Sequence, residues 1–208
     1  IVYVSYNSLP GLSQVAPLQR LLTERSAPGA GDSVERLGQA IDFVARLERA
    51  GAGSFRVNPL AKSRLDALAR QDPRYLVHEY ANANWSLFYH ADVAQELAGA
   101  KLAYAGSTEY LDNFNQFIFS PEMAALVAEI RDPPAVPTIK DYARNQVFRR
   151  DVFTRGAPKA GPRELDALLG RTRFALARPR AACQLSRATA AGEVTLQAQA
   201  YAPVLDAL

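Results

Sequence analysis

The sequence has few of the residues on which small catalytic and metal-binding sites usually depend. It contains one cysteine, Cys183, and two histidines, His78 and His90. A single cysteine excludes an internal disulfide and is typical of proteins from a reducing compartment such as the cytosol. Because no histidine lies near Cys183 in the sequence, we expect its thiol to be inert rather than nucleophilic.

The familiar cofactor and nucleophile motifs are also missing. There is no Gly-x-Gly-x-x-Gly sequence and no Walker loop, so the usual backbone cradle for a dinucleotide or nucleoside cofactor is absent. There is no Gly-x-Ser-x-Gly elbow to expose a serine nucleophile. His78-Glu79 begins like a zinc-protease motif, but the position of the second histidine is Asn82. We therefore expect this chain by itself to bind no cofactor and no metal, and to have no catalytic residues.

Long apolar runs are absent as well. No stretch approaches the roughly 20 apolar residues that a membrane-spanning helix needs. The first residues lack the basic region and cleavage site of a signal peptide, so we expect a cytoplasmic protein with no membrane partner. The chain starts inside an apolar run, Ile1-Val2-Tyr3-Val4, without a methionine. Because a natural terminus is rarely a strand with unpaired edges, we expect the sequence to be an excerpt from a longer protein.

What is present is typical of a soluble globular protein. The 208 residues are 49% hydrophobic and 22% charged, with a net charge of +3. The basic charge is concentrated in residues 140–187, which hold 12 basic and 4 acidic side chains. Arg149 and Arg150, beside Phe148, could therefore contact nucleic acid. The alternative is a solvated basic face with an Arg–Asp pair on a strand edge, and no known nucleic-acid module supports the first interpretation.

Hydrophobic periodicity predicts an α+β fold, mainly α, with a helical, bundle-like middle and a few strands at the two ends. The first strand, 1–6, is apolar on both faces, which predicts a central strand covered on both sides. Turn and capping residues place the other elements, with Ser33 and Ser107 as expected helix caps. The predicted helices begin near residue 16 and at 33, 58, 72, 91, 107, 120, 138, 163 and 201, and the predicted strands are 102–105, 148–153, 173–177 and 193–199.

The stretch from His78 to Gly106 holds both histidines and the only tryptophan. Two imidazoles with the carboxylates of Glu79 and Asp92 could hold a metal ion, which makes a small metal-dependent enzyme using a His78/His90 cluster one alternative. Alternatively, His78 and Glu79 satisfy polar groups at a helix junction. Three aromatic residues, Trp85, Phe88 and Tyr89, could form a cage for a cation or simply fill a core.

Four motifs in a fixed order resemble a known family. They are Tyr6-Asn7-Ser8-Leu9-Pro10-Gly11, then His78-Glu79-Tyr80 with Trp85 and Phe88-Tyr89-x-x-Asp92-Val93-Ala94, then Tyr104-x-Gly106-Ser107, and then Phe148-Arg149-Arg150-Asp151-Val152-Phe153-x-Arg155-Gly156. This series resembles the predicted methyltransferase regulatory domain of bacterial class I S-adenosylmethionine-dependent methyltransferases. It is also similar to the rickettsial protein-lysine methyltransferases. The resemblance covers about Val2 to Gly156.

The resemblance implies a site and a division of the chain. It implies that 1–25 is a remnant of the methyltransferase sheet and its exit loop, that 26–156 is a helical regulatory and dimerisation domain, and that 157–208 is a small α/β segment. Loops at 26–31 and 158–162 are the expected boundaries. The implied substrate-binding or regulatory residues are Tyr6, Asn7, Pro10, His78, Glu79, Trp85, Tyr89, Asp92, Arg149, Arg150 and Asp151.

The resemblance also implies a function. The chain would regulate, dimerise and position the substrate of a methyltransferase without being catalytic alone. S-Adenosylmethionine would bind only in the full-length protein, whose catalytic domain would be this chain's partner in the same polypeptide. A homodimer and a protein substrate are the other implied partners, in the bacterial cytoplasm.

Overall fold

The computed structural model describes residues 1–27, 31–82, 84–156 and 160–208, which form two compact units. We call Tyr6–Tyr89 with Asn145–Phe148 the helical unit. We call Ile1–Ser5, His90–Arg144 and Arg149–Leu208 the sheet unit. The expected boundary loops, 26–31 and 158–162, fall partly on 28–30 and 157–159, which lie outside the described residues. The predicted division into three segments therefore stays a prediction.

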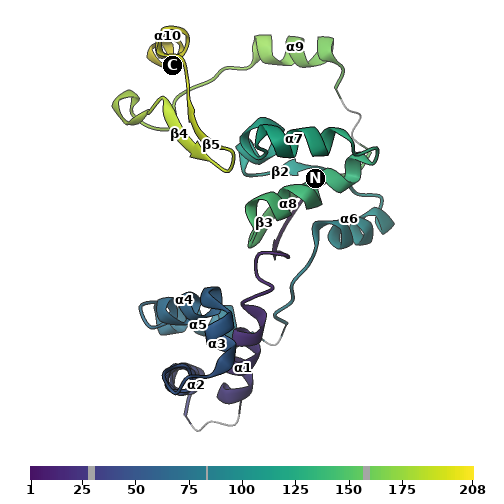
Figure 1. Cartoon of the computed structure of the whole chain (residues 1–208). Coiled ribbons are helices and arrows are strands. Elements are labelled where there is room, and N and C mark those ends of the chain that lie inside the picture. The colour runs from purple at the N-terminus through teal and green to yellow at the C-terminus, as the bar shows by residue number, and fades with distance from the viewer. Residues whose placement is uncertain (28–30, 83, 157–159) are drawn as a thin grey trace. The chain divides into compact units, whose positions relative to one another are not determined.

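The helical unit consists of five helices around one apolar core (Figure 1). Leu22, Leu37 and Val44 are fully or almost fully buried at its centre. The side chains of Gln19 and Thr23 both donate to the carbonyl oxygen of Tyr80, which joins the first helix to the end of the fifth. The helices are α1 (Ala16–Ser26), α2 (Ser33–Arg49), α3 (Gly53–Val57), α4 (Pro59–Leu68) and α5 (Pro73–Tyr80).

The starts of these helices follow the sequence signals, with one correction. Asn58 and Asp72 accept hydrogen bonds from backbone amides and are each followed by a proline in the first turn, as predicted. The prediction that Ser33 caps α2 was wrong. Asp32 caps it, because its carboxylate accepts from the amides of Val34 and Glu35 while Glu35 accepts from the Asp32 amide. The five-residue helix α3 was not predicted.

The sheet unit is built on a three-stranded sheet in the order β1-β3-β2. Its strands are β1 (Val2–Asn7), whose last two residues belong to the helical unit, β2 (Ala103–Ser107) and β3 (Phe148–Thr154). β2 and β3 are antiparallel, and their register shifts between Tyr104 and Gly106. The other elements up to β3 are α6 (His90–Gly99), η1 (Tyr110–Asn113), η2 (Asn115–Phe117), α7 (Pro121–Ala128), η3 (Pro133–Ala135) and α8 (Val136–Arg144).

Two predictions for this unit were wrong. β1 was expected to be a central, doubly covered strand, but in this sheet it is an edge strand with Val2 37% and Tyr3 56% exposed. Ser107 was expected to cap a helix, but it ends β2, and the 3₁₀ helix η1 that follows begins only at Tyr110 with Glu109 before it. The Ser107 hydroxyl accepts from the Glu109 amide while the Asn113 side chain bonds the Ser107 backbone, and these local bonds favour a turn.

The last part of the sheet unit holds α9 (Pro162–Arg171), η4 (Arg180–Ala182), a hairpin of β4 (Ser186–Thr189) and β5 (Gly192–Thr195), and α10 (Ala198–Ala207). The predicted strand at 173–177 is wrong, since this segment has no regular structure. The predicted strand 193–199 ends early because α10 begins at Ala198. In the described part of the chain, no helix combines the length and apolar character needed to cross a membrane. The fold is α+β and mainly α, as predicted.

Candidate functional site

The centre of the candidate site is one face of β3. Burial alternates along this strand: Arg149, Asp151 and Phe153 are 0–7% exposed, whereas Arg150 is exposed and Val152 is only half-buried. Alternate side chains of a strand point to the same face, so the three buried residues share one side of the sheet. Two of the three carry charge, which is costly inside a protein unless the charges are paired.

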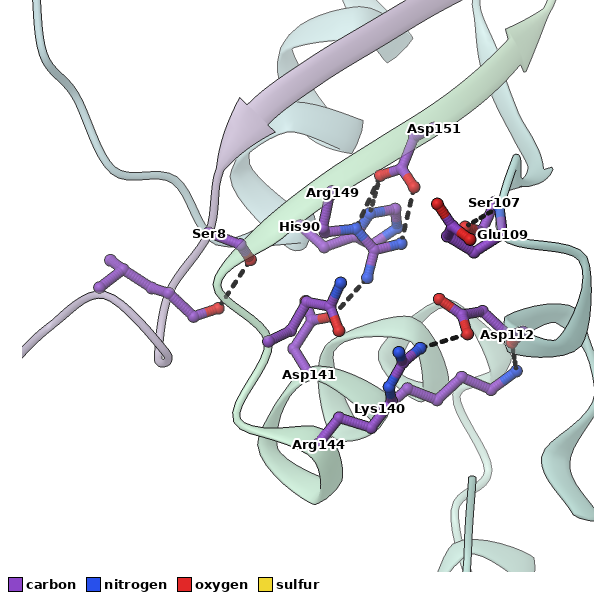
Figure 2. Close-up of polar contacts among 12 residues, drawn as sticks. Ser8, His90, Ser107, Glu109, Asp112, Lys140, Asp141, Arg144, Arg149 and Asp151 are labelled. Atoms are coloured by element: carbon purple, nitrogen blue, oxygen red, sulfur yellow. Dashed lines mark hydrogen bonds and ion pairs between the residues drawn. The ribbon is translucent and has the colours of Figure 1, made fainter. Parts of the chain in front are cut away.

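The charges on this face are paired through Arg149 (Figure 2). Its guanidinium donates to both carboxylate oxygens of Asp151, from Nε over 2.7 Å and from Nη2 over 3.0 Å. From Nη1 it donates to Oδ1 of Asp141 on α8 over 2.5 Å. The Nδ1 atom of His90, at the start of α6, lies 3.2 Å from Oδ2 of Asp151. These contacts fasten two helices, α6 and α8, to the middle strand of the sheet.

Tyr104 on β2 closes the cluster from the side. Its hydroxyl accepts from Arg149 Nη2 over 3.3 Å, and its ring packs edge-on against His90 at 4.6 Å between centroids. Burial raises the pKa of the Tyr104 hydroxyl to about 12. We call the five residues His90, Tyr104, Asp141, Arg149 and Asp151 the Arg149 network.

Asp141 is the unusual member of the Arg149 network. Its side chain is buried, and its Oδ2 atom has no hydrogen-bond partner among the described residues. Burial raises the pKa of Asp141, and the neighbouring Arg149 offsets this only in part. Two carboxyl groups thus share one guanidinium, and the protonated form of Asp141 reduces the unpaired negative charge in the cluster.

A second group of ion pairs lies around Asp112 of η1. Arg144 of α8 forms an ion pair with the Asp112 carboxylate, and Lys140 donates from Nζ to the Asp112 carbonyl over 2.7 Å. Burial lowers the pKa of Lys140, and Asp112 partly offsets this. Arg150, on the exposed face of β3, donates to Glu109 over 2.7 Å. Figure 2 shows the contacts of Asp112 with Arg144 and Lys140 near the ion pairs of Arg149.

These pairs bear on the nucleic-acid alternative. Arg149 is buried and cannot reach a phosphate, and Lys140, Arg144 and Arg150 already have acceptors within the fold. The alternative prediction was an Arg–Asp pair on a strand edge. Arg149 and Asp151 form such a pair, but it is buried. The geometry therefore does not favour nucleic-acid binding through this part of 140–187.

The loop after β1 is held by backbone hydrogen bonds within the helical unit. The amide of Leu9 donates to the Phe88 carbonyl, the amide of Ser8 to the Val147 carbonyl and the amide of Gly11 to the Gln146 carbonyl, over 2.9–3.1 Å. Gly11 is required by close approach, since a Cβ atom there would lie 2.3 Å from the Gln146 oxygen.

Of the residues predicted at this place, Tyr6 and Asn7 end β1 and Pro10 lies in the loop. Tyr6 is buried, and its ring packs edge-on against Phe88 at 6.2 Å. Asn7 accepts from the Phe88 amide over 3.0 Å, and Pro10 follows a cis peptide bond. The contact between Phe88 and Tyr6 favours the core interpretation of Phe88 over the cation cage.

The other predicted residues are divided between the two units. His78 is exposed on α5 and Glu79 is half-buried, while Trp85 and Tyr89 are half-buried in the segment before α6. Asp92 is exposed in the first turn of α6, in the sheet unit. A common role for these five residues stays a prediction.

The two histidines have different surroundings. His78 belongs to the helical unit, whereas His90 is buried in the sheet unit against Asp151. Within 1–27, 31–82, 84–156 and 160–208, no group of three or more His, Cys, Asp or Glu residues could hold a metal ion. The structure gives no support to the alternative of a metal-dependent enzyme built on His78 and His90.

Sequence reasoning missed Asp141, named Tyr104 only as part of a motif and not as a site residue, and assigned His90 only to a metal site. The alternation of Phe148–Thr154 could have shown that Arg149 and Asp151 share the face of Phe153 and need buried partners. No sequence signal identified which residues those partners are, because they lie 8 to 61 positions away.

Comparisons with known proteins show which family part of this chain resembles. Residues 72–155 match the family described as the predicted methyltransferase regulatory domain. This segment includes β2, β3, α6 and α8, and thus the entire Arg149 network. An uncharacterized protein of Synechocystis sp. is 36% identical over all 208 residues, and this chain covers 41% of its length.

Two solved structures of PKMT2 from Rickettsia typhi share the fold. The first, in complex with AdoHcy, is 20% identical with a TM-score of 0.55 and matches 74% of this chain and 29% of its own. The second is 19% identical with a TM-score of 0.57 and matches 80% of this chain and 31% of its own. The chain thus spans less than half the length of the relatives it matches. Residues 72–155 of this chain are thus similar to the predicted methyltransferase regulatory domain family.

Proposed function

We propose that this chain is the regulatory, dimerisation and substrate-positioning region of an S-adenosylmethionine-dependent methyltransferase and is not catalytic alone. The observation that carries the proposal is the family match at 72–155, in a chain that covers only 41% of its Synechocystis relative. That relative has more than half of its length left for a further domain. The sequence here has no glycine-rich cofactor loop.

The Arg149 network supports a structural rather than a catalytic role for the sheet unit. The side chains of His90, Asp141 and Asp151 are at most 2% exposed, so a methyl acceptor cannot touch them. A general base must lie within hydrogen-bonding reach of the group that it deprotonates. The network instead fixes α6 and α8 to β3, which would give a neighbouring catalytic domain a rigid surface to act against.

The edge strand β1 supports a partner in the same polypeptide. Val2 and Tyr3 of β1 are 37% and 56% exposed, so the strand leaves apolar side chains uncovered at the edge of the sheet. An exposed edge of this kind is suited to pairing with another strand. We propose that the sheet of the catalytic domain continues at β1, which would bring Tyr6 and Asn7 to the border of the active site.

The exposed members of the signature motif would then contact the substrate or a second copy. In the helical unit His78 is exposed and Glu79, Trp85 and Tyr89 are half-buried, so that unit retains polar and aromatic surface for a partner. In the sheet unit Asp92 is exposed. Aromatic residues with a polar rim are common in protein recognition sites. A protein side chain is the methyl acceptor that this surface would help to position.

The first test is calorimetry of the 208-residue chain with S-adenosylmethionine and S-adenosylhomocysteine. We expect no heat of binding, because the chain lacks the cofactor cradle. A methyltransferase with a glycine-rich loop serves as the positive control. Stoichiometric micromolar binding by this chain would contradict the proposal.

The second test uses a methyltransferase polypeptide that contains this chain and a catalytic domain. We expect His78→Gln with Asp92→Asn to lower transfer of labelled methyl groups to protein, with S-adenosylmethionine affinity unchanged. Light scattering of the same protein should give the mass of a dimer. Unchanged transfer in the double variant would remove the positioning role, and a monomer would remove the dimerisation role.

A further inference from the structure

The last part of the sheet unit contains a groove between η4, the β4–β5 hairpin and α10. Its walls are joined by two contacts. Nε of Arg180 donates to Oδ1 of Asp206 over 2.6 Å, and the amide of Leu196 donates to the Leu185 carbonyl over 2.8 Å. The volume of the groove is about 850 Å³. We call this feature the hairpin groove, and it lies outside the residues 72–155 that match the family.

The hairpin groove is lined by two arginines and, among the residues that the structure describes, by no acidic side chain. Arg178 and Arg187 are both exposed, and neither forms an ion pair within the described part of the chain. The carboxylate of Asp206 is already paired, and that of Glu193 accepts from the Ser186 hydroxyl over 2.5 Å. The two guanidinium groups therefore remain available to an external anion.

The surrounding sequence adds to this positive charge. Residues 171–190 contain five arginines and no aspartate, glutamate or lysine. A guanidinium group presents a planar fork of donors that matches the two oxygens of a carboxylate. Since each of Arg178 and Arg187 could hold one carboxylate, the groove is suited to a ligand with more than one negative charge.

The floor of the hairpin groove decides which kind of anion fits. Leu196 and Leu205 are half-buried and line it, so the ligand also meets apolar surface. None of the described residues that line the groove is aromatic, whereas single-stranded nucleic acids are held mainly by stacking of bases on aromatic rings. Several wall residues, among them Ala182 and Gln184, are exposed, so a small molecule would not be enclosed. An extended peptide, which makes contacts along its length, fits such an open groove.

We propose that the hairpin groove binds an acidic peptide segment of a partner protein, with carboxylates on Arg178 and Arg187 and an apolar side chain against Leu196 and Leu205. The inference does not depend on the proposed methyltransferase role, since it rests on the charge and shape of this groove alone.

The test is a fluorescence-anisotropy titration of the 208-residue chain with a fluorescein-labelled, amidated peptide, Gly-Asp-Leu-Glu-Leu-Asp-Gly. We expect saturable binding that weakens as salt is added, because salt screens exposed charges. The amide twin, Gly-Asn-Leu-Gln-Leu-Asn-Gly, should show no saturable binding. A third peptide, with serine in place of both leucines, should bind more weakly than the first because it cannot use the apolar floor.

The single thiol of the chain reports where the peptide binds. Cys183 is half-buried and lines the hairpin groove, and the sequence has no other cysteine. Saturating acidic peptide should slow the alkylation of Cys183 by iodoacetamide severalfold, whereas the amide twin should leave the rate unchanged. An unchanged rate with bound acidic peptide would place the binding elsewhere and overturn the proposal.

Three variants separate the groove from general attraction to a basic chain. Arg178→Gln and Arg187→Gln should each weaken binding of the acidic peptide about fivefold, the factor that corresponds to one exposed ion pair. Arg173→Gln is the matched control, because Arg173 is also exposed, removes the same charge and does not line the groove. It should leave the affinity almost unchanged, and circular dichroism verifies that all three variants are folded.

Four results would overturn the proposal. The first two are absence of binding and equal binding of the acidic peptide and its amide twin. An equal loss of affinity in Arg173→Gln would show that the attraction is not specific to the groove. Tighter binding of a single-stranded oligonucleotide of the same charge would assign these arginines to nucleic acid instead.

Discussion

Arg149 and Asp141 form a buried ion pair in which Nη1 of Arg149 donates to Oδ1 of Asp141 over 2.5 Å. The pair connects the central strand of the sheet to helix α8. The same guanidinium holds Asp151 with two further hydrogen bonds, so one cation serves two carboxyl groups. The stability changes that we expect for variants of the sheet unit follow mainly from this shared cation.

Substitution of Arg149 should destabilise the chain far more than substitution of its neighbour. Arg149→Met leaves two buried carboxyl groups without a cation, and we expect the free energy of unfolding to fall by about 3–5 kcal/mol. Arg150→Met removes only an exposed pair with Glu109 and should cost about 0–1 kcal/mol. Urea denaturation followed by circular dichroism measures both. Equal losses in the two variants would refute a buried role for Arg149.

The stability contribution of Asp141 should depend on pH in a direction that its raised pKa sets. The folded state binds the Asp141 proton more tightly than the unfolded state, where the pKa is about 3.9. Protonation therefore favours folding, and this contribution is complete below about pH 3.9 and lost as pH rises through the raised pKa. Compared with Asp141→Asn, the unmodified chain should gain relative stability as the pH falls from about 7 toward about 4. Urea midpoints across this range test the trend, and a relative loss would contradict it.

Tyr104 should be among the last of the nine tyrosines to ionise. Its pKa is about 12 in the folded chain, above the ordinary value of about 10, so its contribution to stability is present below about pH 10. That contribution is lost as pH rises from about 10 to about 12. Tyr104→Phe should remove the latest step of the phenolate absorbance titration and flatten the loss of stability in this interval. An unchanged late step would show that Tyr104 is not buried in this way.

Gly11 should not tolerate even alanine. The added methyl group would lie 2.3 Å from the Gln146 carbonyl oxygen, and relieving this contact requires a backbone shift. We expect Gly11→Ala to lower the free energy of unfolding by about 1–3 kcal/mol. Gly99→Ala is the matched control, since a methyl group there meets nothing within 4 Å. Similar midpoints for the two variants would count against the close approach of these backbones.

The correction at the start of α2 can be checked directly. Asp32→Ala removes the carboxylate that accepts from two amides and should cost about 1 kcal/mol. Ser33→Ala removes no cap and should change stability by less than about 0.5 kcal/mol. Thermal unfolding of both variants distinguishes the two residues. A larger effect at Ser33 would restore the original assignment.

Local signals in the sequence predicted most of the helices and the central strand. Proline after Asn58, Asp72 and Ser120 marks three helix starts that the structure confirms. These signals succeed because capping involves residues only two or three positions apart. The failure at Ser107 has the same origin, since a serine also forms turns, and only the Asn113 side chain decides between the two outcomes.

The sequence was less informative about the site because the network is built from distant residues. Arg149 and Asp151 were predicted as site residues, but their partners were not. His90 lies 61 positions before its partner Asp151, and Tyr104 lies 45 positions before its partner Arg149. The outcome at β1 has a similar reason. An apolar sequence predicts a central strand even when the strand has a neighbour on one side only. In the described sheet, β1 pairs with β3 and has no strand on its other side.

The separation of His90 and Asp151 in the chain also has a consequence for biosynthesis. During translation, His90 emerges from the ribosome long before its carboxylate partner, and Arg149 and Asp151 emerge almost together. α6 therefore lacks the contact between His90 and Asp151 until the residues of β3 have been made. A nascent chain arrested before Arg149 should present α6 to proteases and chaperones, whereas one arrested well beyond Asp151 should protect it.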